Sequence, residues 1–94
     1  MKVKNLNGTS VIRCKCSSWL AHWLRYSGQK ASKCSVLGCT NRELVGGHVQ
    51  MDSPGDTAWY VIPVCKSCNQ KTGQALNISD QVPLVSAIPS HTCG

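Results

Sequence analysis

The 94-residue sequence predicts one small domain of the α+β class. Its apolar residues form one helix-like stripe and several short strand-like runs. The chain has three Trp, two Tyr and no Phe, so a purely hydrophobic core would be thin. Against this background stand seven cysteines, four of which form two closely spaced pairs. We therefore expect a metal ion or disulfide bonds to staple the domain.

The first regular element is predicted to be a helix, after an irregular or extended lead-in over residues 1–12. Ser17 or Ser18 can cap it, and Gly28 is a suitable stop, so the helix should end near Ser27. Its large apolar residues recur at helical spacing, which predicts one buried stripe. The stripe consists of Trp19, Leu20, Trp23 and Leu24.

The second half of the chain is predicted to contain short strands and one short helix. Two glycines weaken the first strand, and Pro63 should limit the second because proline cannot donate to a sheet ladder. The expected elements are strands over 44–49, 59–62 and 84–88, a turn over 52–56, and a helix over 66–72 that Gly73 ends.

The two cysteine pairs carry the strongest chemical signal. Cys34 and Cys39 enclose four residues, and Cys65 and Cys68 enclose two. Zinc prefers four soft or borderline ligands in a tetrahedron, and two close pairs can supply them. The second pair lies where a helix begins, so amides of the first turn can hydrogen-bond the thiolates. The pairs predict a four-cysteine zinc site, with buried thiols or disulfide bonds as alternatives.

The segment from Cys34 to Gly73 resembles the HNH endonuclease family in its treble-clef form. The resembling features are a two-cysteine knuckle, Gly-His-Val on the next strand, and Cys-Lys-Ser-Cys-Asn-Gln-Lys-Thr-Gly at the helix start. The resemblance implies a zinc-stapled treble-clef (HNH-like) core over residues 34–73 with an extra N-terminal helix. It implies that the four paired cysteines bind the zinc, and it places His48 at the position of the general base.

The remaining catalytic positions depart from the family pattern. Gly47 stands where the family has an acidic or His metal ligand, Asn69 where it has His or Asn, and Tyr60 near an Asn that orients the base. A hard divalent ion needs oxygen or imidazole ligands, which Gly47 lacks. His48 has three interpretations: a general base, a metal ligand, or an ordinary strand histidine with a hydrogen-bond partner.

Three further cysteines lie outside the resembling segment. Cys14 and Cys16 precede the predicted helix, and Cys93 lies near the C-terminus. Three thiols and one imidazole are a complete zinc ligand set, and His22 is favoured over His91 because a helix would hold it. This second zinc would tie the helix to the C-terminal tail. A disulfide bond from Cys93 to Cys14 or Cys16, or free thiols, are the alternatives.

The net charge of +6 is unevenly distributed. Residues 1–42 hold eight of the ten basic residues and no acidic one, whereas residues 43–94 hold two basic and four acidic residues. A basic half of this kind predicts nucleic acid or an acidic protein surface as the partner. The candidate contact residues are Lys30, Lys33 and Arg42.

Residues 1–94 are thus expected to form a single zinc-binding domain with one of three functions. A non-catalytic nucleic-acid-binding protein on an HNH-like scaffold is favoured because the catalytic positions are degenerate. An active metal-dependent nuclease using His48 is the second. A basic interaction module, such as an inhibitor of the phage or mobile-element type, is the third. No apolar signal segment or membrane span is visible, so a cytoplasmic location is expected.

Overall fold

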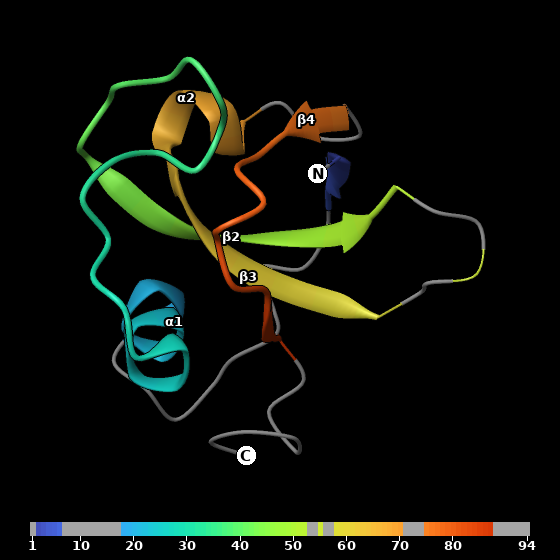
Figure 1. Cartoon of the computed structure of the whole chain (residues 1–94), viewed down its shortest axis with the longest axis horizontal. Helices are drawn as coiled ribbons and strands as arrows, with labels where there is room; N and C mark the ends of the chain where they lie inside the picture. Colours follow the sequence, from blue (N-terminus) through green and yellow to red (C-terminus); the bar gives the residue numbers. More distant parts are fainter. Residues whose placement is uncertain (1, 7–17, 53–54, 56–57, 71–74, 88–94) are drawn as a thin grey trace.

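The architecture is an antiparallel sheet with a helix on each side of its central hairpin. The computed structural model describes residues 2–6, 18–52, 55, 58–70 and 75–87. In chain order the elements are β1 (Lys2–Asn5), α1 (Trp19–Ser27), β2 (Leu44–Met51), β3 (Trp59–Cys65), α2 (Lys66–Asn69), β4 (Ala75–Asn77) and β5 (Val85–Ser86). Within these described residues, five strands pair in the order β4-β1-β2-β3-β5 (Figure 1). The α+β class is therefore confirmed.

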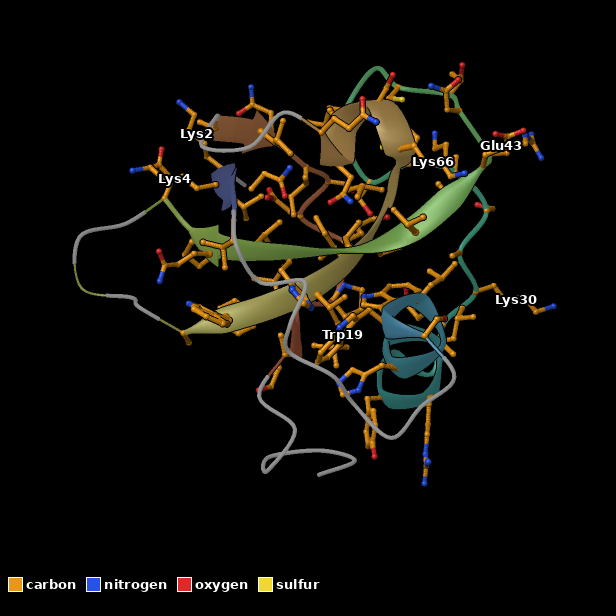
Figure 2. The ribbon with its side chains drawn as sticks, turned by 180° about the vertical axis from the view of Figure 1, so that it is seen from behind. Lys2, Lys4, Trp19, Lys30, Glu43 and Lys66 are labelled. Atoms are coloured by element: carbon orange, nitrogen blue, oxygen red, sulfur yellow. The ribbon has the colours of Figure 1, made fainter. Side chains whose placement is uncertain are left out.

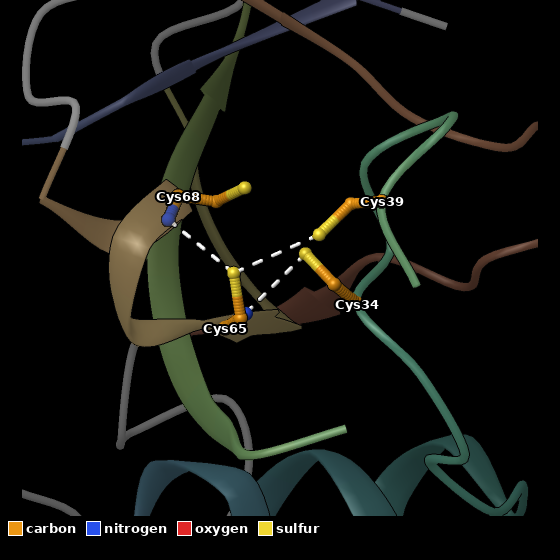
Figure 3. A group of neighbouring side chains, drawn as sticks. All are labelled: Cys34, Cys39, Cys65 and Cys68. Carbon is orange, nitrogen blue, oxygen red and sulfur yellow. Dashed lines mark hydrogen bonds between the residues drawn. The ribbon is translucent and has the colours of Figure 1, made fainter. Parts of the chain in front are cut away.

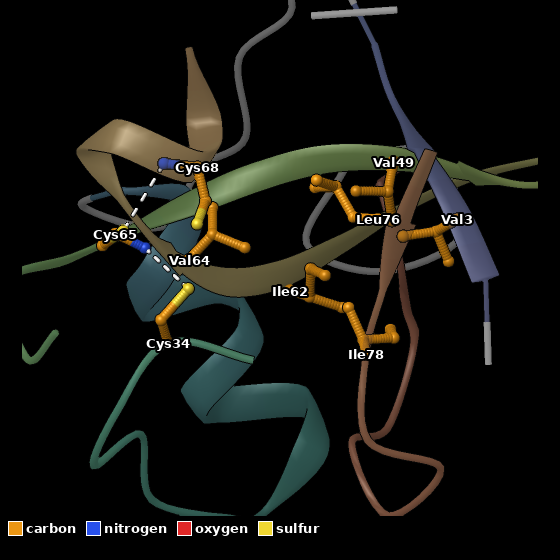
Figure 4. Close-up of a cluster of buried hydrophobic side chains, with 9 residues drawn as sticks. All are labelled: Val3, Cys34, Val49, Ile62, Val64, Cys65, Cys68, Leu76 and Ile78. Carbon is orange, nitrogen blue, oxygen red and sulfur yellow. Dashed lines mark hydrogen bonds between the residues drawn. The ribbon is translucent and has the colours of Figure 1, made fainter. Parts of the chain in front are cut away.

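The hairpin of β2 and β3 separates the core into two clusters. Side chains alternate across a strand, so Val61 faces α1 while its neighbour Ile62 faces the opposite side. The cluster on the α1 side contains Trp23, Val61 and Val85. The cluster on the other side, drawn in Figure 4, contains Val3, Cys34, Val49, Ile62, Val64, Cys65, Cys68, Leu76 and Ile78. Three cysteines thus belong to the larger cluster, which joins the cysteine site to the core.

The helix α1 has the predicted bounds and caps. The Ser18 side chain accepts a hydrogen bond of 3.0 Å from the backbone N–H of Ala21, and Gly28 ends the helix at a φ of 68°. Its buried face is rotated from the predicted stripe, because Leu24 is 39% exposed whereas His22 is fully buried. The imidazole can occupy this position because its Nε2 atom donates to the Ser86 carbonyl at 2.9 Å.

The strand β3 continues through Pro63 to Cys65, so the prediction that Pro63 limits it was wrong. Pro63 lies opposite Gly46 in the β2–β3 register, but its carbonyl points away from β2. That carbonyl accepts hydrogen bonds from the backbone N–H and the hydroxyl of Ser35, at 3.0 and 2.6 Å. The backbone nitrogen of Pro63, which carries no hydrogen, also faces this outer edge. The ladder of hydrogen bonds between β3 and β2 is therefore intact.

Two strands, β1 and β4, have no counterpart in the predicted strands. The lead-in of the chain is extended, as expected, but it also pairs with β2 and with β4. The last strand is shorter than predicted, at two residues, and α2 ends at Asn69 with Gln70 as its cap. The predicted stop at Gly73 lies outside the described residues. Among the described residues, no helix is long and apolar enough to cross a membrane.

Candidate metal centre

The four paired cysteines meet at one point of the fold (Figure 3). Cys34 and Cys39 bound a tight turn between α1 and β2, which we call the knuckle (residues 34–39). Cys65 is the last residue of β3, and Cys68 lies in α2. Their four Sγ atoms all lie within 4.8 Å of one another, so these cysteines can hold a single metal ion.

The sulfur separations match a tetrahedral site. Four sulfurs at about 2.3 Å from a zinc ion stand about 3.8 Å from one another. The Sγ atoms of Cys39 and Cys65 are 3.8 Å apart. A disulfide bond needs about 2.05 Å, and all four described cysteines are free. The geometry therefore fits a shared ion better than a covalent bridge.

Backbone N–H groups and one side-chain amide donate hydrogen bonds to the sulfurs. The backbone N–H of Cys65 donates to Cys34 Sγ at 3.3 Å, and that of Cys68 donates to Cys65 Sγ at 3.4 Å. The side-chain amide of Asn41 donates to Cys65 Sγ at 3.5 Å. Such donors stabilise thiolates and orient them toward a metal. The sequence prediction included the amides of the α2 turn but missed Asn41, whose only signal is a polar side chain just after the knuckle.

The same contacts set the protonation of the metal-free cluster. Burial tends to raise the pKa of Cys65, but the hydrogen bonds from Asn41 and Cys68 outweigh it and lower that pKa to about 6. Burial, together with the neighbouring Cys65 and Cys34, raises the pKa of Cys68 to about 12. Burial also raises the pKa of Cys34. At neutral pH, the Cys65 side chain is therefore a thiolate. A metal ion that binds must displace the protons of Cys34 and Cys68.

Two asparagines form hydrogen bonds that hold different segments of the metal centre in place. The backbone carbonyl of Asn41 accepts a 2.9 Å hydrogen bond from the N–H of Cys34, which closes the knuckle. Asn5, at the end of β1, is buried and donates its side-chain amide to the Asn69 carbonyl at 2.6 Å and the Cys68 carbonyl at 3.3 Å. These carbonyls lie at the end of α2, so β1 caps the helix that carries Cys68.

His48 faces away from the centre. Its ring lies edge-on to Trp19 of α1, with ring centroids 4.4 Å apart, and the side chain is buried. Burial, and to a smaller degree the nearby His22, lower the pKa of His48, so the imidazole is neutral at neutral pH. The structure does not bring His48 onto the face where Gly47 meets α2.

Gly47 and Asn69 lie against each other. A Cβ atom on Gly47 would stand 3.0 Å from Asn69 Oδ1 and 2.6 Å from the Val64 side chain. The space that a ligand side chain would need at position 47 is already filled. Tyr60 packs against the larger core cluster.

The candidate second metal site falls largely outside the described residues. Cys14, Cys16 and Cys93 lie there, as does the alternative ligand His91. His22 is described; it is fully buried and its Nε2 donates to the Ser86 carbonyl. The second zinc stays a prediction.

The candidate contact residues Lys30, Lys33 and Arg42 are all exposed. They flank the knuckle on both sides in sequence, and a fourth cation, Lys66, begins α2. A shallow hollow beside Cys65 is lined by Arg42, Glu43 and Lys66. In Figure 2, Lys30 and Lys66 lie on one side of the molecule, away from Lys2 and Lys4. The metal centre thus lies among exposed basic residues, with the acidic Glu43 beside them.

Comparison with known proteins assigns no family to this arrangement. No protein family, no curated protein and no solved structure matches the chain.

Proposed function

We propose that the four cysteines bind zinc and that the protein is a non-catalytic, zinc-stapled nucleic-acid-binding domain. We further propose that the knuckle, the β2–β3 hairpin and α2 are a treble-clef core of the HNH type. The chemistry of the donor set supports zinc, because four thiolates in a tetrahedron are a typical structural zinc site. Such a site leaves no open position for a reacting molecule.

The observation that carries nucleic-acid binding is the group of exposed cations around the centre. Lys33 directly precedes the knuckle, Arg42 follows it closely, and Lys66 begins α2 beside Cys65. Phosphate contacts of this kind supply most of the sequence-independent affinity for nucleic acid. Because the zinc fixes the knuckle against α2, it also fixes the spacing of these charges.

The position of His48 supports the non-catalytic form of this proposal. A general base must reach the water that it activates, and phosphodiester hydrolysis also needs a cation at the phosphate. His48 is buried under Trp19, and Gly47 and Asn69 leave no room for an ion between them.

Salt dependence of binding tests the proposal. We expect a labelled oligonucleotide to bind at about 50 mM salt and to dissociate steeply as salt rises. Lys30→Gln with Lys33→Gln should lower the slope of log affinity against log salt by about 1 for each lysine. Lys2→Gln with Lys4→Gln is the control, since it removes the same charge from another part of the surface. Lack of binding to either DNA or RNA would favour an acidic protein partner instead.

A further inference from the structure

A groove of about 390 Å³ lies beside the metal centre. Its walls come from Trp23 of α1, the segment over 29–33, the knuckle, and Ser79, Gln81 and Val82. The volume lies near the lower end of the range for small-molecule sites, and it is too small for a duplex. A groove of this volume can hold one planar ring system with its substituents.

The lining combines apolar surface, neutral polar side chains and positive charge. Leu37, which is 60% exposed, and the half-buried Val82 supply apolar surface, and Ser32 and Gln81 supply donors and acceptors. The exposed residues Lys30 and Lys33 also line the groove. Among the described residues, none of those that line the groove is a carboxylate. The groove is therefore complementary to an anion that carries a flat, partly apolar group.

Hydrogen bonds hold the walls in place without a ligand. The N–H of Leu37 donates to the Asn77 carbonyl at 2.9 Å, and the N–H of Ser79 donates to the Ser35 carbonyl at 3.3 Å. The indole N–H of Trp23 donates to the Pro83 carbonyl at 2.9 Å. A site built in advance in this way loses little conformational entropy when it binds.

We infer that this groove holds one unpaired nucleotide of the bound nucleic acid, an inference that rests on the proposed function and specifies its substrate. The base would lie against Leu37 and Val82, with its edge toward Gln81 and Ser32. The phosphates on either side would meet Lys30 and Lys33. Recognition of a splayed-out base by apolar surface and polar side chains, with cations on the backbone, is typical of single-strand binding. The protein therefore prefers single-stranded segments to duplexes.

Binding of matched oligonucleotides tests this inference. The probes are a labelled single strand of about 12 nucleotides, within the usual site sizes, and the same strand in a duplex. We expect the single strand to bind about tenfold more tightly than the duplex. Ser32→Leu should fill the groove and remove this preference, while affinity for the duplex is unchanged. Ser67→Leu on α2 is the matched control and should keep the preference.

A second pair of variants protects the test against a folding defect. Gln81→Leu should weaken single-strand binding like Ser32→Leu, and Gln70→Leu, an exposed glutamine at the end of α2, should not. Metal content and melting temperature identify any variant that fails to fold. If a variant of one pair fails to fold, the other pair of variants tests the inference.

Different failures have different meanings. Equal affinity for single strand and duplex, or a preference that persists in both groove variants, overturns the inference and leaves nucleic-acid binding standing. Binding to neither probe overturns the proposed function itself. Displacement of the single strand by a poly-glutamate peptide in the wild type, but not in Ser32→Leu, would overturn the inference by showing that the groove takes an acidic chain.

Discussion

Gly46 and Gly47 are neighbours in β2, yet each leaves room for a different layer of the domain. A Cβ atom on Gly46 would stand 2.5 Å from the backbone carbon of Trp19, and one on Gly47 would stand 2.6 Å from Val64 Cγ2. The first lies under α1 and the second under α2. Two adjacent positions without side chains therefore let both helices approach the hairpin closely.

Alanine at either glycine should destabilise the fold by overpacking. We expect a loss of about 3 kcal/mol for Gly46→Ala, because the Trp19 backbone cannot move without α1. Gly47→Ala should cost about 1–2 kcal/mol, since only side chains must yield. Gly55→Ala, which has open space around it, is the control and should change stability by less than about 0.5 kcal/mol. Denaturant unfolding measures all three, and equal stability of Gly46→Ala and wild type would contradict the close approach of α1.

Elemental analysis of protein purified without added metal should find at least one zinc per chain. Cys65→Ser should remove this zinc and unfold the domain, because Cys65 and its partners are part of the core and metal binding contributes to folding. A second zinc that disappears in Cys14→Ser with Cys16→Ser would support the second site. A metal-free wild type that stays folded would contradict the four-cysteine zinc site.

Stability should fall as the pH drops below about 6.5, partly through His48. The pKa of His48 is lowered by burial, so below the pKa of the unfolded state the unfolded chain binds more protons than the folded one. This contribution is complete above about pH 6.5 and is lost on further acidification. His48→Gln removes it while the zinc site stays intact, so the variant should show a weaker pH dependence in thermal melts at saturating zinc. Parallel curves for both proteins would show that His48 titrates alike in both states.

The purified protein should not nick plasmid DNA with magnesium or manganese. The imidazole of His48 is turned toward Trp19, and no ligand faces Asn69 from position 47. His48→Gln should therefore leave the assay unchanged. Metal-dependent nicking by the wild type that disappears in this variant would mean that another group completes an ion site.

The sequence predicted the local features well because they depend on short-range rules. The cap at Ser18, the stop at Gly28 and the cysteine spacing each follow from residues a few positions apart. The pairing of β1 with β2 and β4 could not be predicted in this way. Those contacts join segments that are far apart in the sequence, and β4 has only three residues, which is too short for a periodic pattern.

The errors at Pro63 and Leu24 have a shared cause. In both cases the residue type predicted one environment, whereas a hydrogen bond to a residue distant in the sequence stabilises a different one. Ser35 donates a hydrogen bond to the carbonyl of Pro63. The Ser86 carbonyl accepts a hydrogen bond from Nε2 of His22. This second bond allows a histidine to be buried on the helix face where a leucine was expected. The orientation of His48 likewise depends on the register of β2 against β3 and on the docking of α1, which spacing alone does not specify.

The contact between Asn5 and the end of α2 has a consequence for synthesis of the protein. Synthesis runs from the N-terminus, so Asn5 is made before its partners Cys68 and Asn69, which lie 63 and 64 residues further along the chain. The strand β1 must also wait for β2 and for β4, and Cys68 is the last of the four clustered cysteines in chain order. Until then the nascent chain carries unpaired thiols and an unpaired first strand, so the domain closes in one late step.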